Sequence, residues 1–281
     1  MRFGLGTANF GIKYGVLDNK ISLSNIKKLL NDTKNINLID TAQSYPGVEK
    51  IIGEHNRHKK KIITKIVPFS EKKIKKNIKN FKHQFQDSLQ DLKKKSVYGL
   101  LFHNEKDILR DDISTFLEYL KDLQDKKKIF KIGISLYNIY DLEKYLKIYK
   151  FDIVQFPINI FTINTKLINY LKSIKKRGIE IHARSIFLQG MLFEKKFSRK
   201  FNELKLKKNK LEIYLAKKKL KKYNYLISVL YDIKFIDYCI IGFRNKENIN
   251  DFSKFKKVVT NLNYVKKLEI KNKNIIDPRK W

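Results

Sequence analysis

The sequence predicts an α/β protein built as a closed (β/α)8 TIM barrel, in which eight parallel strands are surrounded by helices. Short apolar runs alternate with helical patterns eight times along the chain, which is typical of parallel strands covered by helices. The length of 281 residues is close to the ~250 residues typical of such a barrel. We therefore expect a single domain over residues 1–281.

The candidate strands are short, mainly apolar runs, and the segments between them repeat an apolar face at helical spacing. The predicted strands span residues 3–7, 36–40, 61–66, 97–103, 130–135, 153–156, 179–184 and 238–242. The predicted helices span residues 22–32, 48–55, 71–92, 111–127, 139–149, 165–177, 208–232 and 246–259. An open doubly wound sheet is the alternative architecture. Its glycine-rich phosphate-binding turn is missing, because Asn9 stands where the third glycine belongs.

The basic composition needs a separate explanation. The formal net charge is +34 at pH 7, and a basic surface strengthens binding to nucleic acids. However, only eight of the 62 basic residues are arginine, the residue best suited to bidentate phosphate contacts. The lysines are scattered through the predicted helices, as on the solvated faces of amphipathic helices. We therefore expect no specific nucleic-acid partner.

Other sequence features bear on the compartment and on metals. No apolar run approaches the ~20 residues of a membrane-spanning helix, and the start of the chain lacks a signal-peptide core. The one cysteine, Cys239, cannot form an internal disulfide, which fits a reducing compartment. The histidines lack the spacing of a metal site. We expect a cytoplasmic protein without a bound metal and without a membrane partner.

Four polar residues lie at or just beyond the ends of three successive predicted strands. They are Asp40 and Tyr45, Lys65, and His103. Each alone has an ordinary explanation, such as a turn cap, a packed loop aromatic, a surface lysine or a core histidine. A (β/α)8 barrel brings the carboxyl ends of its strands to one face, where its enzymes keep their active sites. The joint position of the four residues therefore favours a catalytic proton-transfer site.

Several longer segments resemble the aldo-keto reductase family, in particular a short bacterial branch found with cell-surface polysaccharide genes. The segments are 5–11 (LGTANFG), 39–45 (IDTAQSY), 47–53 (GVEKIIG), 63–65 (ITK), 101–104 (LFHN), 131–135 (KIGIS), 183–190 (ARSIFLQG) and 276–281 (IDPRKW). The resemblance implies a barrel oxidoreductase that reduces a small-molecule aldehyde or ketone to an alcohol. It also implies NADP(H) as the cofactor, with NAD(H) as the alternative.

The resemblance gives each of the four strand-end residues a role that the chemistry supports. Carbonyl reduction needs a hydride, which a nicotinamide supplies because no side chain can donate one, and a proton, which Tyr45 would donate as general acid. A positive charge ~4 Å from a phenol is worth about 4 kcal/mol at an effective dielectric near 20, or about three pKa units. We therefore expect Lys65 to lower the pKa of Tyr45. Asp40 would hold Lys65 in place, and His103 would donate a hydrogen bond to the substrate oxygen.

The resemblance also implies a set of cofactor-binding residues. They are Gly6, Thr7 and Asp40 beside the nicotinamide ribose, Ser135 and Gln155 at its carboxamide, Arg184, Ser185 and Gln189 at the ring or diphosphate, and Gly242 and Arg244 near the 2′-phosphate. Arg244 begins the turn into the last predicted helix, whose free amides suit a phosphate.

The substrate pocket is less defined by the sequence, because loops form it. Its candidate walls are Asn9, Phe10, Tyr14, Asn159 and Phe161, which suit a sugar aldehyde or ketone. The alternative function is a non-catalytic barrel that binds the cofactor and acts as a regulatory or partner-binding subunit. The intact set of four strand-end residues favours the enzyme.

Overall fold

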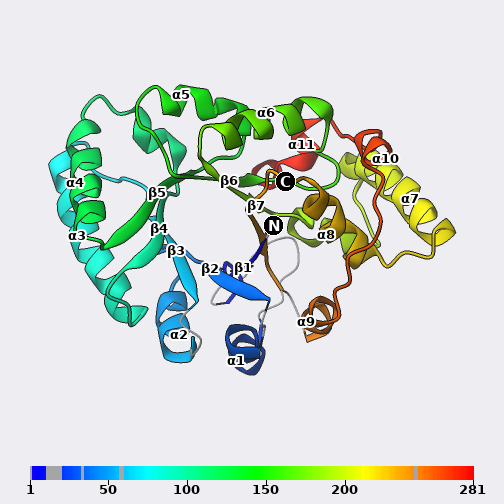
Figure 1. Cartoon of the computed structure of the whole chain (residues 1–281), viewed down its shortest axis with the longest axis horizontal. Coiled ribbons are helices and arrows are strands. Elements are labelled where there is room, and N and C mark those ends of the chain that lie inside the picture. Colours follow the sequence, from blue (N-terminus) through cyan, green and yellow to red (C-terminus); the bar gives the residue numbers. More distant parts are fainter. Residues whose placement is uncertain (1, 11–20, 33–34, 57–59, 244–245) are drawn as a thin grey trace.

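A computed structural model describes residues 2–10, 21–32, 35–56, 60–243 and 246–281. Eight parallel strands pair in chain order, and the last closes on the first, so the predicted (β/α)8 barrel is confirmed (Figure 1). The strands are β1 (Arg2–Gly6), β2 (Ile36–Asp40), β3 (Lys61–Ile66), β4 (Val97–Phe102), β5 (Ile129–Ser135), β6 (Ile153–Pro157), β7 (Glu180–Arg184) and β8 (Tyr238–Ile241). The strand register sets Asp40 beside Gly6 and Ser135 beside Gln155.

Helices surround the barrel on its outer side (Figure 1). They are α1 (Leu23–Asp32), α2 (Val48–His55), α3 (Ile74–Asp91), α4 (Ser114–Asp125), α5 (Leu142–Leu146), α6 (Thr165–Lys176), α7 (Asn202–Lys217), α8 (Lys222–Asp232), α9 (Lys246–Ser253), α10 (Leu262–Lys266) and α11 (Lys273–Ile276). The shorter 3-10 turns are η1 (Glu105–Leu109), η2 (Ile139–Asp141), η3 (Leu188–Phe193), η4 (Arg199–Phe201) and η5 (Pro278–Lys280).

The prediction of one helix over residues 208–232 is wrong, because the structure has two helices there, α7 and α8. Lys219 has a left-handed backbone, with φ of 53°. Its amide bonds to the carbonyl of Ala216, and the amide of Leu220 bonds to the carbonyl of Leu215. This is a Schellman helix end, which usually carries glycine at the left-handed position. Because lysine occupies this position instead of glycine, the sequence does not indicate that the helix ends here.

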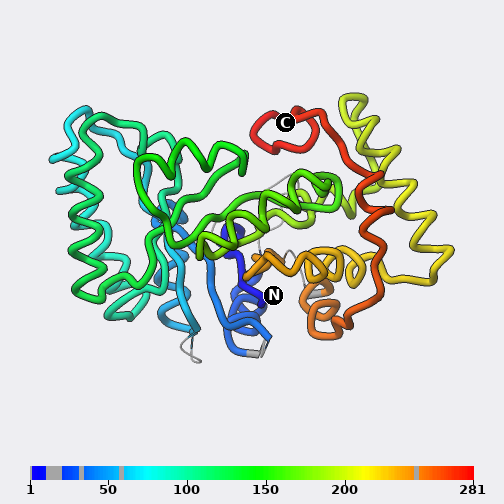
Figure 2. The backbone as a smooth tube through the Cα atoms, turned by 45° about the horizontal axis from the view of Figure 1, so that its top comes forward, coloured from blue at the N-terminus to red at the C-terminus, as the bar shows by residue number. Residues whose placement is uncertain are grey.

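The C-terminal part also differs from its prediction. The helix predicted over residues 246–259 ends at Ser253, and α10 and α11 follow. The amide of Ile270 bonds to the carbonyl of Phe161, which fixes this segment on the loop after β6. Figure 2 shows this segment, orange to red, running along the side of α7 and then turning inward to the C-terminus. The guanidinium of Arg279 lies 3.6 Å from the ring centroid of Tyr137.

The barrel interior is filled by apolar side chains from several strands. Leu38, Ile63, Leu101 and Ile153 form an apolar cluster there, separate from the larger core between strands and helices. At Gly133 an added Cβ would lie 2.8 Å from the Cβ of Ile153, closer than real side chains approach. Bulky side chains on some strands therefore require glycine on their neighbours, as the layered interior of such barrels demands.

A buried polar cluster lies at the amino end of the strands, away from the predicted site. The carboxylate of Glu180 accepts hydrogen bonds from Tyr98 (2.8 Å) and from Lys131, and His182 Nε2 lies 2.6 Å from its other oxygen. Burial by itself would raise the pKa of Glu180. The bonds from His182, Lys131 and Tyr98 outweigh burial and lower the pKa to about 2.

This cluster predicts a specific dependence of stability on pH. The folded pKa of Glu180 is depressed below its unfolded value near ~4.3, so the charged form stabilises the fold above that pH. We expect Glu180→Gln to have a lower Tm than wild type at pH 7. The difference should shrink as pH falls from ~4.3 towards 2. Thermal melts across this range test it, with the exposed Glu118→Gln as control. A pH-independent difference would contradict the assignment.

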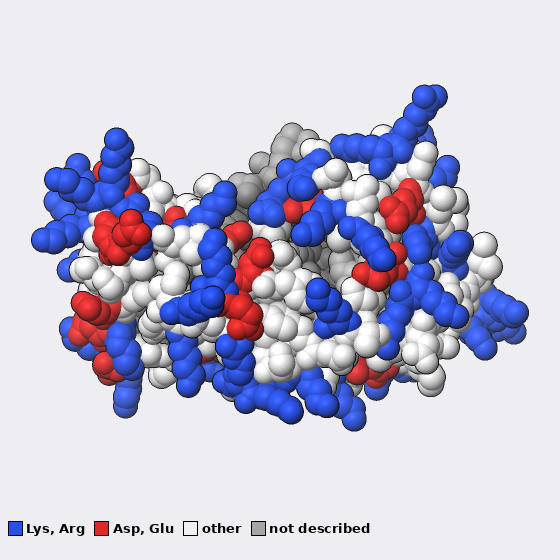
Figure 3. All heavy atoms as spheres, turned by 90° about the horizontal axis from the view of Figure 1, so that it is seen from above, with Lys and Arg blue, Asp and Glu red and all other residues white. Residues whose placement is uncertain are grey.

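Figure 3 shows lysine and arginine side chains scattered between uncharged areas on one face, with fewer acidic side chains. The basic side chains are spread across several elements of that face. No helix in the described part of the chain is long and apolar enough to cross a membrane.

Candidate active site

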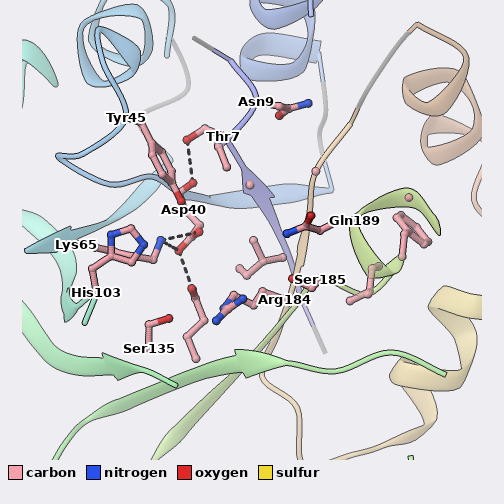
Figure 4. A pocket seen from close by; sticks show the side chains of 18 of the residues that line it. Thr7, Asn9, Asp40, Tyr45, Lys65, His103, Ser135, Arg184, Ser185 and Gln189 are labelled. Carbon is pink, nitrogen blue, oxygen red and sulfur yellow. Dashed lines mark hydrogen bonds and ion pairs between the residues drawn. The ribbon is translucent and has the colours of Figure 1, made fainter. Parts of the chain in front are cut away.

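A pocket of about 370 Å³ opens at the carboxyl ends of the strands. The predicted site residues that line it are Gly6, Thr7, Asp40, Tyr45, Lys65, His103, Ser135, Gln155, Arg184, Ser185, Gln189 and Gly242. Arg244 lies outside the described residues. Figure 4 shows Tyr45, Lys65 and His103 on one side of Asp40, with Arg184, Ser185 and Gln189 on the other.

Asp40 and Lys65 form a buried ion pair at the floor of the pocket. Lys65 Nζ lies 2.9 and 2.8 Å from the two carboxylate oxygens of Asp40, and 2.9 Å from the carbonyl oxygen of Thr41. The exposed fractions of Lys65 and Asp40 are only 2% and 6%. The three protons of the ammonium are therefore all directed at acceptors on β2 and the residue after it. The expected contact between Asp40 and Lys65 is present.

Tyr45 stands at the edge of this pair, but the expected effect of Lys65 on its pKa is wrong for this structure. Burial raises the pKa of the Tyr45 phenol above its usual range, and the Asp40 carboxylate raises it further, while Arg184 opposes this. Lys65 Nζ lies 6.0 Å from the ring centroid of Tyr45. Because its protons all bond to Asp40 and Thr41, none is directed at the phenol. Tyr45 is therefore protonated throughout the neutral range.

His103 follows β4 and lies against Tyr45, with ring centroids 6.1 Å apart and planes at 84°. Burial, together with the charge of Lys65, lowers the pKa of His103 to about 4, although the Asp40 carboxylate opposes the shift. The imidazole is therefore neutral at pH 7. Ser44 Oγ lies 3.3 Å from His103 Nδ1. When Ser44 donates to this nitrogen, the proton of the ring is on Nε2.

The lowered pKa of His103 predicts a loss of stability in mild acid. The unfolded chain gains a proton on this histidine near pH ~6.5, whereas the folded protein does not until pH is about 4. Stability is therefore lost as pH falls between these values. We expect the Tm of His103→Gln to rise relative to wild type on going from pH 7.5 to pH 4.5. If the Tm difference between the two proteins is constant over this range, the pKa is not depressed.

Gln155 connects the ion pair to the other half of the pocket. Its Nε2 donates a hydrogen bond of 2.7 Å to Asp40 Oδ1. Its Oε1 is buried and has no hydrogen-bond partner among the described residues. Ser135, the last residue of β5, also lines the pocket and is buried. A buried amide oxygen without a partner is costly, so this oxygen is suited to accept a bond from a ligand.

The segment after β7 has an unusual backbone where it lines the pocket. Ser185, Leu188 and Gln189 have φ of 56°, 49° and 47°, in the left-handed region that non-glycine residues rarely adopt. The turn is held by hydrogen bonds between main-chain atoms, including one of 2.8 Å from the amide of Leu188 to the carbonyl of Ser185. Such strain is concentrated at binding sites in proteins. It supports a binding role for this turn.

Arg184, at the end of β7, is held by neighbours that the sequence did not indicate. Its guanidinium lies 4.4 Å from the ring centroid of Tyr137 and donates a 3.2 Å bond to the carbonyl of Leu136. Its Nε is buried without a hydrogen-bond partner in the described ranges. Tyr137 thus lies against both Arg184 and Arg279, which ties the C-terminal segment to the pocket rim.

The aromatic pocket walls differ from those predicted. Asn9 lines the pocket, but Phe10, Asn159 and Phe161 do not line it, and Tyr14 lies outside the described residues. The Asn159 side chain instead accepts a bond from the amide of Phe161 and so stabilises its own loop. The aromatic residues that line the pocket, besides Tyr45, are Tyr137, Phe187, Phe193 and Tyr223. They come from segments whose turns and breaks had no clear signal in the sequence.

The fold and the pocket together define a barrel enzyme, with its polar site at the carboxyl ends of the strands. The chain belongs to the aldo/keto reductase family, whose family model matches residues 2–269. It is therefore a carbonyl-reducing oxidoreductase of a family that uses nicotinamide cofactors and small-molecule carbonyl substrates. Within the described residues, no group of three or more His, Cys, Asp or Glu side chains is arranged to hold a metal ion.

Solved structures agree with this assignment at the level of the fold. The aldo-keto reductase AKR11C1 from Bacillus halodurans in its holo form has a TM-score of 0.72 at 17% identity, over 96% of this chain and 92% of that chain. The glycerol dehydrogenase AKR11B4 from Gluconobacter oxydans has a TM-score of 0.69 at 19% identity, over 99% of this chain and 92% of that chain. No protein of curated function matches the chain.

Proposed function

We propose that the protein reduces an aldehyde or ketone to an alcohol with NADP(H), using Tyr45 as the general acid. The observation that carries this proposal is the joint placement of Tyr45, the Lys65–Asp40 pair and His103 around one end of the pocket. Reduction of a carbonyl needs a proton donor and a group that stabilises negative charge on oxygen. These side chains provide both.

The other end of the pocket fits a nicotinamide. The unpartnered Oε1 of Gln155 is an acceptor that matches the amino group of a carboxamide, and Ser135, the register partner of Gln155 on β5, also lines the pocket. When bound, the nicotinamide supplies the hydride. Gln155 also bonds to Asp40, so the same carboxylate orients the residue that binds the cofactor and the residue that supports Tyr45. Gly6 and Thr7 lie next to Asp40 and would contact the nicotinamide ribose.

In this proposal, the raised pKa of Tyr45 keeps the proton on the phenol until it is needed. As charge develops on the substrate oxygen, the phenol becomes the nearest acid, and the Lys65 ammonium stabilises the phenolate that forms. His103, neutral at pH 7, donates from Nε2 to the same oxygen and orients the carbonyl. Lys65 would redirect one of its three protons from the Thr41 carbonyl or Asp40 to the phenolate.

The choice of NADP(H), with NAD(H) as the alternative, depends on the basic residues near the nucleotide end. Arg184 lines the pocket with a buried, unpartnered Nε, and it would cover the nicotinamide ring or bind the diphosphate with Ser185 and Gln189. Gly242 opens the segment that leads into α9. Arg244, two residues before the start of α9 in the sequence, would bind the 2′-phosphate.

We further propose a hydroxylated, sugar-like carbonyl compound as the substrate, in carbohydrate metabolism in the cytoplasm. The pocket combines the amides of Asn9, Gln189 and Asn248 with the rings of Tyr137 and Tyr223, a mixture that suits sugar hydroxyls and ring faces. One structural relative is a glycerol dehydrogenase, a name consistent with a polyol or its carbonyl form.

The experiment that tests the proposal is a titration of the protein with NADPH and with NADH, in which fluorescence quenching measures binding. Each complex is then offered 4-nitrobenzaldehyde and a set of aldoses and ketoses, and nucleotide oxidation is recorded. We expect NADPH to bind more tightly than NADH and to be oxidised in the presence of a carbonyl compound. If neither nucleotide binds at about 0.5 mM, in the upper part of the usual range of KM values, the proposed function is wrong.

A further inference from the structure

Helix α2 contains a buried carboxylate, Glu49, on the side of β3 that faces away from the pocket. It takes no part in the proposed chemistry. Glu49 is 6% exposed. Its Oε1 accepts a hydrogen bond of 2.6 Å from the Thr64 hydroxyl in β3, and its Oε2 accepts one of 2.6 Å from the Ser88 hydroxyl in α3. Burial raises the pKa of Glu49, while these two bonds oppose the rise. A buried carboxylate needs such partners, so the three side chains form a specific joint between β3, α2 and α3.

The joint is adjacent in the chain to two of the residues that would carry the reaction. Thr64 directly precedes Lys65, and since successive strand residues face opposite sides, Thr64 faces the helices while Lys65 faces the pocket. Tyr45 lies four residues before Glu49. The amide of Val48 bonds to the carbonyl of Tyr45 at 3.2 Å, which connects the tyrosine to the first turn of α2.

The start of the same loop is also fixed to β3. The amide of Thr41 bonds to the Ile63 carbonyl at 2.9 Å, and the amide of Gln43 bonds to the Lys65 carbonyl at 3.3 Å. The segment that carries Tyr45 is therefore attached at its start to residues 63 and 65, and at its end, through Glu49, to residue 64 between them. Both attachments lie on the strand that positions Lys65.

The packing of α2 leaves Glu49 little freedom to move. Gly53 lies one turn beyond Glu49 on the same helix face. A Cβ added at Gly53 would lie 1.9 Å from the Asp91 carbonyl oxygen, so α2 and the end of α3 are in direct backbone contact. This close approach brings the Glu49 carboxylate within reach of Ser88.

We propose that Glu49 is a positioning residue for the reaction: through Thr64 and Ser88 it holds the Tyr45 loop at a fixed distance from Lys65. The proposal rests on the proposed function, since it concerns the placement of the proton donor. Glu49 touches neither substrate nor cofactor, and the residues assigned to the nicotinamide lie on other strands. Loss of the joint should therefore affect the chemical step and leave nucleotide binding intact.

The test compares Glu49→Ala, Glu49→Gln and Thr64→Val with wild type, using 4-nitrobenzaldehyde and the nucleotide that wild type prefers. Because a shift of about 1 Å in a reacting group can cost up to 10²-fold, we expect Glu49→Ala and Thr64→Val to lower kcat by about tenfold or more. Nucleotide Kd should stay within about threefold of wild type. Glu49→Gln should recover most of the kcat, because its amide can accept from Thr64 and donate to Ser88.

A stability control separates positioning from general loosening. Asn77→Ala removes a buried side chain at the start of α3, which bonds to the Glu71 carbonyl at 2.8 Å, and should lower Tm without changing kcat. If Glu49→Ala keeps the wild-type kcat, or if Asn77→Ala loses kcat equally, Glu49 has no positioning role. Should Glu49→Ala fail to fold, Thr64→Val decides the question by the same criteria.

Hydrogen exchange distinguishes a failure of this inference from a failure of the proposed function. Faster amide exchange of residues 41–48 in Thr64→Val, with unchanged exchange in α1, would support the joint even if wild type reduced no carbonyl compound. Unchanged exchange over residues 41–48 would overturn the joint. A wild-type protein that binds no nucleotide would overturn the proposed function alone.

Discussion

Replacing Tyr45 by phenylalanine is expected to lower kcat for carbonyl reduction by roughly 10²- to 10⁴-fold, the usual contribution of a positioned general acid. The change removes only the hydroxyl of a half-buried ring that packs edge-on against His103. In the proposed mechanism this hydroxyl supplies the proton that the substrate oxygen receives, so its removal should slow the chemical step. Nucleotide binding should be unchanged, since Tyr45 is not one of the residues assigned to the cofactor.

The matched control is Tyr137→Phe, which removes a hydroxyl from another aromatic residue of the same pocket. Its ring still packs against Arg184 and Arg279, so most of the activity should remain. Stopped-flow measurement of a single turnover reports the chemical step for both variants. Equal rates for Tyr45→Phe and wild type would remove Tyr45 from the mechanism.

Breaking the Asp40–Lys65 pair from one side should have the second large effect. Lys65→Met leaves the Asp40 carboxylate buried, with Gln155 as its one remaining side-chain partner among the described residues. Removing one member of a buried ion pair typically costs about 3 to 5 kcal/mol of stability, because the other charge is left uncompensated. Activity should fall as well, since the phenolate of Tyr45 then lacks a cation. Denaturant unfolding and steady-state kinetics measure the two effects.

The double variant Asp40→Asn with Lys65→Met separates these two consequences. It contains no unpaired charge, so its free energy of unfolding should lie closer to wild type than that of Lys65→Met. Its activity should stay as low as that of the single variant, because the cation is still absent. A double variant that regained activity would show that Lys65 serves stability alone.

The strands were predictable from the sequence because each is a short apolar run bounded by polar residues, as at Ile153 in β6 and Ile240 in β8. The ends of the helices were less predictable from the sequence. The end of α7 depends on the left-handed backbone of Lys219. Glycine at this position would have indicated a helix end, whereas lysine does not. The path of the C-terminal segment depends on contacts such as Ile270 with Phe161, which are distant in the sequence. The expected single domain over residues 1–281 stays a prediction.

The site also contains residues that could be predicted from the sequence and residues that could not. Asp40, Lys65 and His103 were predictable because the fold itself brings strand ends together, and a strand end can be read from the sequence. The pocket walls at Tyr137 and Tyr223 were not predictable, because tertiary packing places the loop after β5 and helix α8 at the pocket. The pKa of Tyr45 was also misjudged. Its direction depends on which acceptors receive the protons of Lys65, and this is a matter of geometry.

In the proposed reaction, a hydride passes from a nicotinamide bound in this pocket to a carbonyl carbon. Its most direct test uses NADPH deuterated at both C4 positions, with 4-nitrobenzaldehyde as the acceptor, and mass spectrometry of the product alcohol. The proposed function predicts one deuterium on the alcohol carbon with wild type, and a greatly reduced yield with Tyr45→Phe. An alcohol without deuterium, or no alcohol from a protein that binds the nucleotide, would contradict it.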